Sequence, residues 1–230
     1  MPDKYALLVI DIQNDFLPGG SLAVQDGDKI IPDVLDLLDS SKYHWDAVAF
    51  SQDWHPKDHT SFASNHADVE PFGQVEFTST KDPNVKSLET VWPNHCIQHC
   101  HGSGFPDQLI EAYKKVNAPK TIVQKGVLQD RDYYSAFNDI WDDNKTELDS
   151  FLKENGITHV FLVGLAYDYC VKFSAESSSK LGYKTFVLKP LSKAINTEKI
   201  NETDEYYEKS GVTIVNDIND GHLDAVQSGH

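Results

Sequence analysis

Three residues that lie far apart in the sequence have the side chains needed for nucleophilic catalysis: Asp11, Lys125 and Cys170. A thiolate is a strong nucleophile, a carboxylate can take the thiol proton and return it to a leaving group, and an ammonium favours the thiolate. Taken singly, a cysteine is more often a small buried hydrophobic residue, and a lysine is more often a solvated charge. The three residues therefore indicate catalysis only if the fold brings them together.

A second group has the side-chain types that bind transition metals. Asp53 and His55 form an Asp-x-His pair just beyond an expected strand, so both can reach one ion as the strand loosens into a loop. His59 and His95 follow in the same region. Carboxylate and imidazole suit Zn²⁺, with Fe²⁺ or Mn²⁺ as alternatives, and three protein ligands would leave positions for water or substrate. The alternative is a polar loop whose histidines cap turns.

The tract His95-Cys-Ile-Gln-His-Cys-His101 resembles a metal cluster by composition. A closed structural zinc site needs four convergent ligands, and this tract lacks a spaced partner pair of the Cys-x-x-Cys kind. We therefore expect no separate structural zinc here.

The elements that must position these residues follow a repeating pattern of a short apolar, β-branched run and then an amphipathic segment. Six runs are typical of buried strands: Tyr5–Ile10, Ala47–Phe50, Thr121–Val123, His159–Val163, Tyr183–Leu188 and Val212–Val215. Helices are expected near 28–42, 106–117, 144–155, 169–181 and 197–210, two of them ending at Gly156 and Gly182. This alternation predicts an α/β three-layer sandwich of Rossmann type, with a central, mainly parallel six-stranded sheet and right-handed crossovers.

Residues 52–104 interrupt this alternation, because they hold many His, Pro, Asn and Asp residues without clear periodicity. So long a loop in a compact domain is usually functional. We expect one domain over residues 1–230, with a metal-binding loop region at about 52–104.

In an open parallel sheet, ligands bind beyond the carboxyl ends of the strands. Asp11 follows the first expected strand, Asp53 the second and Lys125 the third, while Cys170 follows the fourth. The carboxylates, the cation and the thiol are thus expected at one edge. Cys170 would lie in the first turn of a helix, where the helix N-terminus and the Lys125 ammonium are expected to lower the pKa of its thiol.

The composition limits the partners. A net charge of −16 and a pI near 4.8 argue against nucleic acid and anionic membranes. No apolar run approaches the ~20 residues of a membrane span, and the first residues do not resemble a signal peptide. Three cysteines cannot form a dense disulfide framework, which favours an intracellular, cytoplasmic location, with the nucleus and peroxisome left open. The oligomeric state, including a homo-oligomer, is left open too.

Five motifs, which occur in order over about residues 5–190, resemble the nicotinamidases, which are isochorismatase-like cysteine hydrolases. The residues of these motifs are most similar to those of the fungal members. The motifs are Asp11-Ile-Gln-Asn-Asp15-Phe16, Asp53-Trp-His55-Pro-Lys-Asp-His59-Thr-Ser-Phe62, Trp92-Pro-Asn-His95-Cys96, Arg131-Asp-Tyr-Tyr-Ser-Ala-Phe137 and Gly164-Leu-Ala-Tyr-Asp-Tyr-Cys170-Val. The resemblance implies hydrolysis of nicotinamide and related heteroaromatic carboxamides to the acid and ammonia, through a Cys170 thioester, in NAD salvage.

The resemblance also implies roles for single residues. The catalytic triad would be Asp11, Lys125 and Cys170, and the metal ligands would be Asp53, His55 and His95, with the ring nitrogen of the substrate on the metal. The Leu165–Ala166 peptide bond would be cis, and the N–H groups of Ala166 and Cys170 would face the developing oxyanion. The substrate pocket would be lined by Phe16, Trp92, Tyr134, Ala166 and Tyr169. His59 matches a position of the pattern but receives no role, and His99-Cys100-His101 lies outside the pattern, so an extra metal contact or a redox-sensitive thiol stays open there.

Three alternatives remain open at this point. In the first, metal-bound hydroxide attacks a related small amide and Cys170 merely packs. In the second, the chain is a cysteine hydrolase of another amide, such as a ureido acid. In the third, it is a catalytically silent metabolite-binding module. The two segments that supply metal ligands favour a heteroaromatic amide, and the complete triad argues against a silent protein.

Overall fold

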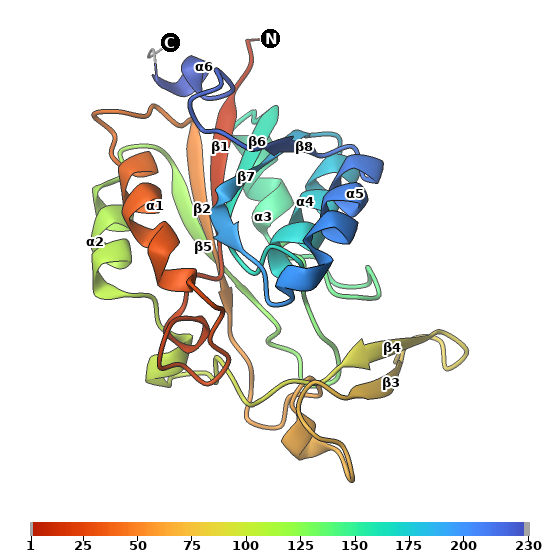
Figure 1. Cartoon of the computed structure of the whole chain (residues 1–230). Helices are drawn as coiled ribbons and strands as arrows, with labels where there is room; N and C mark the ends of the chain where they lie inside the picture. Colours follow the sequence, from red (N-terminus) through yellow and green to blue (C-terminus); the bar gives the residue numbers. More distant parts are fainter. Residues whose placement is uncertain (1, 228–230) are drawn as a thin grey trace.

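The computed structural model describes residues 2–227, in which a six-stranded sheet lies between two layers of helices (Figure 1). The strand order is β5-β2-β1-β6-β7-β8, and every neighbouring pair is parallel. The strands are β1 (Tyr5–Ile10), β2 (Ala47–Asp53), β5 (Lys120–Lys125), β6 (His159–Leu165), β7 (Lys184–Lys193) and β8 (Thr213–Val215). The predicted α/β sandwich is confirmed.

Successive side chains of β1 point to opposite faces of the sheet, so its continuous apolar run is buried on both. Leu7 and Val9 belong to the core cluster that includes apolar residues of α1 and α2, and Leu8 and Ile10 belong to the cluster that includes those of α3, α4 and α5. Figure 1 shows α1 and α2 on one side of the sheet and the other three helices on the opposite side. The helices are α1 (Ile31–Leu37), α2 (Asp107–Lys115), α3 (Leu148–Glu154), α4 (Cys170–Lys180) and α5 (Ile200–Lys209).

The sheet order places the expected catalytic residues on neighbouring strands. Lys125 ends β5, Asp53 ends β2, Asp11 directly follows β1, and Cys170 begins α4 after β6. Asp53 and Lys125 are also register partners at the ends of their strands. The four strands β5-β2-β1-β6 therefore deliver two carboxylates, an ammonium and a thiol to one edge of the sheet.

Several elements differ in length from the prediction, α1 and β7 among them. The helix expected over 28–42 is α1 alone, preceded by a 3₁₀ turn (Gly27–Ile30) and followed by a turn in which Asp39 accepts from the backbone and hydroxyl of Ser41. Strand β7 continues to Lys193, and its register with β6 shifts between Leu162 and Gly164. As predicted, Gly156 and Gly182 follow α3 and α4 with positive φ angles.

The loop region 52–104 is more ordered than its sequence indicates, which corrects the expectation of an irregular loop. It contains an antiparallel hairpin of β3 (Gln74–Thr78) and β4 (Lys86–Thr90), seen at the lower right of Figure 1. Phe77 of β3 packs with Ala63 and Val91 in a small cluster separate from the main core. Phe77 is the one buried side chain within β3 and β4. The two strands therefore carry little of the apolar pattern from which strands are predicted.

The opposite end of the sheet carries α6 (Asp224–Gln227), where the Val226 carbonyl accepts from the His44 N–H (Figure 1). Within residues 2–227, none of the helices combines the length and the apolar character needed to cross a membrane.

Candidate active site

Lys125 is a fully buried cation at the centre of the site. Its Nζ lies 2.9 Å from Asp11 Oδ2 and 2.5 Å from Asp53 Oδ1. It also donates to the Tyr133 carbonyl at 2.9 Å and to Cys170 Sγ at 3.4 Å. A buried ammonium is tolerated only when it is paired and hydrogen-bonded, and these four contacts satisfy that requirement. The ammonium thereby holds both carboxylates and the thiol in one cluster.

The Asp11 carboxylate is held by a hydrogen bond from Ser51 in addition to its contact with Lys125. Asp11 has a left-handed backbone, with φ of 47°, and its side chain turns back over β2. The Ser51 hydroxyl donates to Asp11 Oδ1 at 2.6 Å. Oδ2 accepts no hydrogen bond within the described residues, and it lies near the Lys125 ammonium. A carboxylate oxygen of Asp11 and Cys170 Sγ lie within 4.8 Å of each other, which is close enough for a short proton transfer on substrate binding.

Burial raises the pKa of the Cys170 thiol well above its usual value; Lys125 opposes this effect, and the carboxylates of Asp11 and Asp53 add to it. The expectation of a lowered thiol pKa is therefore wrong, because the helix N-terminus and one ammonium do not outweigh desolvation and two negative charges. Burial also raises the pKa of Asp11, although Lys125 and Ser51 oppose it. The resting site thus holds a neutral thiol beside a carboxylate with strengthened affinity for a proton.

Three buried side chains next to this cluster form a group that could hold a metal ion. Ligand atoms of Asp53, His55 and His95 all lie within 4.8 Å of one another. The Nδ1–H groups of the two histidines donate to backbone carbonyls, His55 to Gly126 at 2.8 Å and His95 to Pro93 at 2.7 Å. Their Nε2 atoms face Asp53 Oδ2, at 3.4 Å and 3.7 Å, and although burial alone would lower the pKa of His55, the Asp53 carboxylate raises it.

The charges of the site fit a divalent cation. Asp11 and Asp53 are both buried, and Lys125 is the one ammonium that pairs with them among the described residues. Although burial alone would raise the pKa of Asp53, Lys125 and His55 hold it far below its usual value, so Asp53 is ionised. Burial lowers the pKa of His95 to about 4, which keeps this imidazole neutral, as a metal ligand must be.

A cavity of about 430 Å³, its open mouth included, adjoins both groups. All five predicted pocket residues line it, as do Asp53, His95 and Cys170. Tyr169 lies edge-on to Trp92, with ring centroids 4.9 Å apart, and beside Tyr134 at 5.7 Å. The full lining comprises Phe16, Leu22, Val24, Asp53, Trp92, His95, Asp132, Tyr133, Tyr134, Leu165, Ala166, Tyr169, Cys170 and Ile195. The walls are mainly aromatic and aliphatic, and Asp53, His95, Asp132 and Cys170 add polar groups, which suits a small flat ligand.

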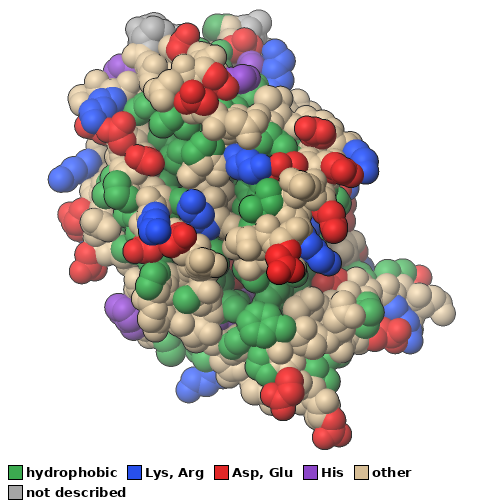
Figure 2. Space-filling model, in the orientation of Figure 1, with side chains coloured by type: hydrophobic (Ala, Val, Ile, Leu, Met, Phe, Trp, Pro, Cys, Tyr) green, Lys and Arg blue, Asp and Glu red, His purple; other side chains and the backbone are tan. Residues whose placement is uncertain are grey.

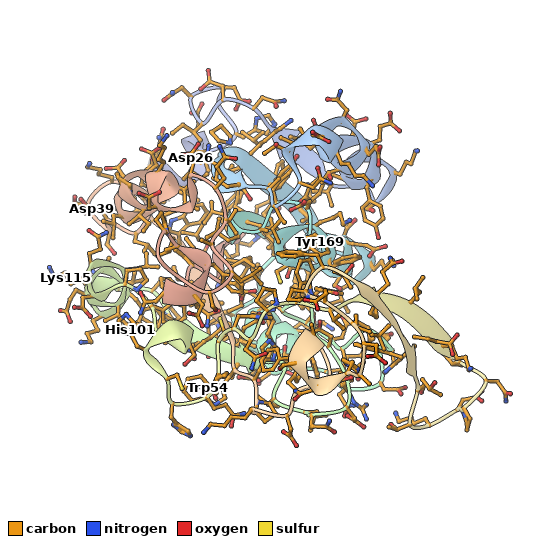
Figure 3. The ribbon with its side chains drawn as sticks, turned by 60° about the horizontal axis from the view of Figure 1, so that its bottom comes forward. Asp26, Asp39, Trp54, His101, Lys115 and Tyr169 are labelled. Atoms are coloured by element: carbon orange, nitrogen blue, oxygen red, sulfur yellow. The ribbon has the colours of Figure 1, made fainter. Side chains whose placement is uncertain are left out.

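The figures locate this cavity at the lower end of the molecule. Figure 2 shows hydrophobic side chains gathered in the lower centre, at the base of the β3–β4 hairpin. In Figure 3, with this end turned forward, Tyr169 lies near the middle, and Trp54 and His101 lie toward the lower left. Substrate would therefore enter at the carboxyl ends of the strands, as expected for an open parallel sheet.

The turn between β6 and α4 has the features expected of an oxyanion site. The Leu165–Ala166 peptide bond is cis, as the sequence resemblance implies. Ala166 and Cys170 both line the cavity, and neither backbone N–H donates a hydrogen bond to any residue in the range 2–227. Two free donors beside the thiol are what a developing oxyanion requires.

A family model described as an isochorismatase domain matches residues 5–215. The chain belongs to the isochorismatase family. Among curated proteins, the nicotinamidase of Saccharomyces cerevisiae is 38% identical over 213 residues, which are 91% of this chain and 98% of the relative. The solved structure of the yeast nicotinamidase bound to the inhibitor nicotinaldehyde has a TM-score of 0.87 and 36% identity, covering 93% of this chain and 100% of that one. The Pyrococcus horikoshii pyrazinamidase, solved in complex with zinc, has a TM-score of 0.68 and 29% identity, covering 92% and 98%.

His59, which the sequence leaves without a role, lies beside the metal-donor group in this isochorismatase-family site. Its ring stacks on His55, with centroids 4.0 Å apart. Its Nε2–H donates to the Arg131 carbonyl at 3.0 Å, and its Nδ1 lies 2.7 Å from the Ser61 hydroxyl. Ligand atoms of His59, His55 and Asp132 also lie within 4.8 Å of one another, but both nitrogens of His59 are already hydrogen-bonded, so we assign it to support of the His55 ring.

The tract His99-Cys100-His101 takes no part in the site. Cys100 is exposed, and His99 packs edge-on against Trp54 with centroids 5.1 Å apart. The groups of metal-type side chains found within residues 2–227 include none of the three.

Three residues of the site were missed in the sequence. Gln13 is fully buried and exchanges hydrogen bonds with the backbone of Asp53, both at 2.8–2.9 Å, which ties β1 to the end of β2. Ser51 holds Asp11, as described above. Asp132 lines the cavity, and burial raises its pKa to about 6. Gln13 and Asp132 lie inside the quoted motifs, but polar side chains in a motif do not reveal which of them are buried.

Replacing Gly126 with alanine should weaken metal binding by the Asp53–His55–His95 group. Gly126 has φ of +68°, and an added Cβ would lie 2.2 Å from Cε1 and 2.4 Å from Nδ1 of His55. The ring would have to leave its place against the Gly126 carbonyl, and a loss of 10- to 100-fold in metal affinity is expected, as for other supports of metal ligands. Metal content after dialysis against graded chelator measures this. Gly182→Ala is the matched control, because Gly182 has φ of +96° with nothing within 4 Å, so only the backbone cost remains. Equal metal content in the two variants would contradict the assignment.

Proposed function

We propose that the chain is a nicotinamidase, which hydrolyses nicotinamide to nicotinate and ammonia through a thioester on Cys170. The observation that carries the proposal is the junction of two groups at one cavity. The Asp11–Lys125–Cys170 cluster supplies nucleophile and base, and the Asp53–His55–His95 group lies on the same wall. Asp53 joins them, because one of its oxygens contacts Lys125 and the other faces both histidines. The nicotinamidase relatives support the same assignment.

In the first half of the reaction the carbon of the substrate carboxamide lies next to the Cys170 sulfur, and its oxygen faces the backbone N–H groups of Ala166 and Cys170. Asp11 takes the thiol proton as sulfur forms a bond to the carbonyl carbon, and the carbonyl electron pair moves onto oxygen, facing the two N–H donors. The carbon–nitrogen bond then breaks as Asp11 returns the proton to nitrogen. Ammonia leaves and the acyl group stays on Cys170 as a thioester. The raised thiol pKa fits this sequence, since the thiolate forms only during attack.

In the second half, water enters where ammonia left. Asp11 takes one proton from the water, whose oxygen bonds to the thioester carbon, and the carbon–sulfur bond breaks. Asp11 passes that proton to the sulfur, and the acid formed loses its remaining proton to solvent and is released as nicotinate. Lys125 stays charged throughout, because Asp11 and Asp53 raise its pKa well above its usual value despite burial. Its role is to stabilise the negative charge that passes between Asp11 and sulfur.

Asp53, His55 and His95 would hold the metal ion, for which we propose Zn²⁺, since a carboxylate and two imidazoles suit this ion and a related pyrazinamidase binds zinc. When bound, the ion supplies a Lewis-acid position for the pyridine nitrogen of the substrate, which fixes the ring. Trp92, Tyr134 and Tyr169 would pack against the faces of the substrate ring. Because such packing suits any flat aromatic ring, we include related heteroaromatic carboxamides in the substrate class.

We further infer one catalytic domain for the chain, with residues 52–104 as its metal-binding region; Met1 and residues 228–230 of this range lie outside the described structure. Its reaction would consume nicotinamide released by NAD-cleaving enzymes and so serve NAD salvage. All three cysteines are free, which supports a reducing intracellular compartment.

The test is release of ammonia from nicotinamide by the purified protein, before and after treatment with a chelator. We expect turnover that falls by at least ~10²-fold on metal removal and returns with added Zn²⁺, because ring positioning contributes this much to a rate. Benzamide, which lacks the ring nitrogen, is the matched control substrate and should be turned over poorly with or without metal. No ammonia from nicotinamide in the zinc-loaded protein would reject the proposed function.

A further inference from the structure

We propose that Ser51 is a positioning residue for the reaction, because its hydroxyl fixes the orientation of the Asp11 carboxylate that acts as the base. This inference deepens the proposed function and rests on it. Ser51 lies in β2, where it is the register partner of Ile10 in β1, the residue before Asp11. Its side chain is buried, at 2% exposure, and it is absent from the residues that line the cavity. Ser51 can therefore affect the reaction only through its neighbours.

Ser51 and Asp11 are joined by hydrogen bonds in both directions. The Ser51 hydroxyl donates to Asp11 Oδ1 at 2.6 Å, and the Asp11 backbone N–H lies 3.2 Å from the Ser51 Oγ and 3.3 Å from its carbonyl oxygen. The backbone of Asp11 is thus fixed to the same serine as its side chain. The left-handed φ of 47° at Asp11 is the turn that brings the carboxylate back over β2.

The two oxygens of Asp11 consequently have different surroundings. Oδ1 is occupied by the Ser51 hydroxyl, whereas Oδ2 lies 2.9 Å from the Lys125 Nζ and accepts no hydrogen bond within residues 2–227. Rotation about the final bond of a free aspartate side chain is broad and roughly two-fold, so a carboxylate with no fixed donor would sample many orientations. The Ser51 hydroxyl on Oδ1 and the Lys125 ammonium near Oδ2 together restrict this rotation, and without the hydroxyl only the contact with Lys125 would remain.

Removing the hydroxyl should slow the chemical step and leave substrate binding intact. Ser51→Ala is expected to lower kcat on the order of 10²-fold, the loss typical of a misplaced catalytic group, with KM for nicotinamide unchanged. Ser51→Thr keeps the hydroxyl on a strand-compatible side chain and should recover most of the rate. A merely structural serine would not give a loss confined to kcat that a second hydroxyl restores.

Ser178→Ala is the matched control. Ser178 is also a buried serine, and its hydroxyl pairs with the Thr185 hydroxyl at 2.8 Å between α4 and β7, away from Asp11. It should lose stability to a similar extent in thermal unfolding while keeping kcat. An unchanged kcat in Ser51→Ala, or a loss that Ser51→Thr fails to restore at equal melting temperature, would overturn the inference.

A second measurement separates this inference from the proposed function. The rate at which iodoacetamide alkylates Cys170 in the substrate-free protein reports on proton removal by Asp11 and needs no nicotinamide turnover. We expect Ser51→Ala to be alkylated at least ~10-fold more slowly than the wild type and than Ser178→Ala. If the wild type releases no ammonia, the proposed function fails, yet the alkylation rates still decide the role of Ser51. Equal rates in all three proteins would reject it.

Discussion

Cys170→Ala is expected to abolish nicotinamide hydrolysis, with kcat lowered by at least ~10⁴-fold, because Cys170 is the one thiol among the described residues that line the cavity. The fold should persist, since the change removes one sulfur atom from a half-buried residue that opens onto the cavity. Ammonia release measures the rate, and metal content should stay at the wild-type level because the Asp53–His55–His95 group is untouched.

Cys100→Ala is the matched control, since Cys100 is a free, exposed thiol outside the site, and it should keep full activity. Mass spectrometry of the wild type quenched during turnover should show the nicotinoyl adduct on the peptide that contains Cys170. Substantial activity of Cys170→Ala would instead favour attack by metal-bound hydroxide. Such a result would leave the metal-donor group as the catalytic centre.

Asp11→Asn should lower kcat by about 10²- to 10⁴-fold, the usual contribution of general acid–base catalysis. The amide keeps the shape of the carboxylate and can still accept from the Ser51 hydroxyl, but it can neither take the thiol proton nor protonate ammonia. Lys125 retains Asp53 and the Tyr133 carbonyl as partners, so its buried charge stays compensated.

Metal content distinguishes this role of Asp11 from another one. The variant should bind zinc as the wild type does, because Asp11 does not belong to the Asp53–His55–His95 group. Loss of zinc would show that Asp11 acts on the metal, and retained turnover would show that another group moves the proton. Asp15→Asn is a useful comparison, since Asp15 lies on the same segment, with its side chain accepting from the Cys96 N–H and not contacting the triad.

Most of the sheet could be predicted from sequence, because its strands are continuous apolar runs that no exposed segment would carry. Strand β1 was predicted to the residue, whereas the predictions for β2 and β5 omitted polar residues at the strand ends, Asp53 and Lys125 among them. Those ends are polar for a functional reason, since they supply the site. The β3–β4 hairpin could not be predicted, because one of its faces is solvated and Phe77 alone is fully buried.

The structure brings Asp11, Lys125 and Cys170 together, as their positions after three of the expected strands indicate, while their catalytic roles stay a prediction. The direction of the pKa shift of Cys170 could not be predicted, because burial of the thiol depends on cavity walls that come from segments far apart in the sequence. Phe16, Trp92 and Ile195 are among the residues of these walls. The same limit applies to Ser51, an ordinary strand residue in sequence whose role depends on the backbone turn at Asp11.

The position of β1 in the middle of the sheet has a consequence for synthesis of the protein. Tyr5 of β1 pairs with His159 of β6, and Cys170 follows β6. A chain growing on the ribosome therefore exposes Asp11, the metal donors and Lys125 before its nucleophile has been synthesised. Until β6 emerges, one edge of β1 is an unpaired apolar strand that other chains could join. Truncation before His159 should therefore yield an aggregating product rather than a partly active one, and hydrolysis can begin only after most of the chain has left the ribosome.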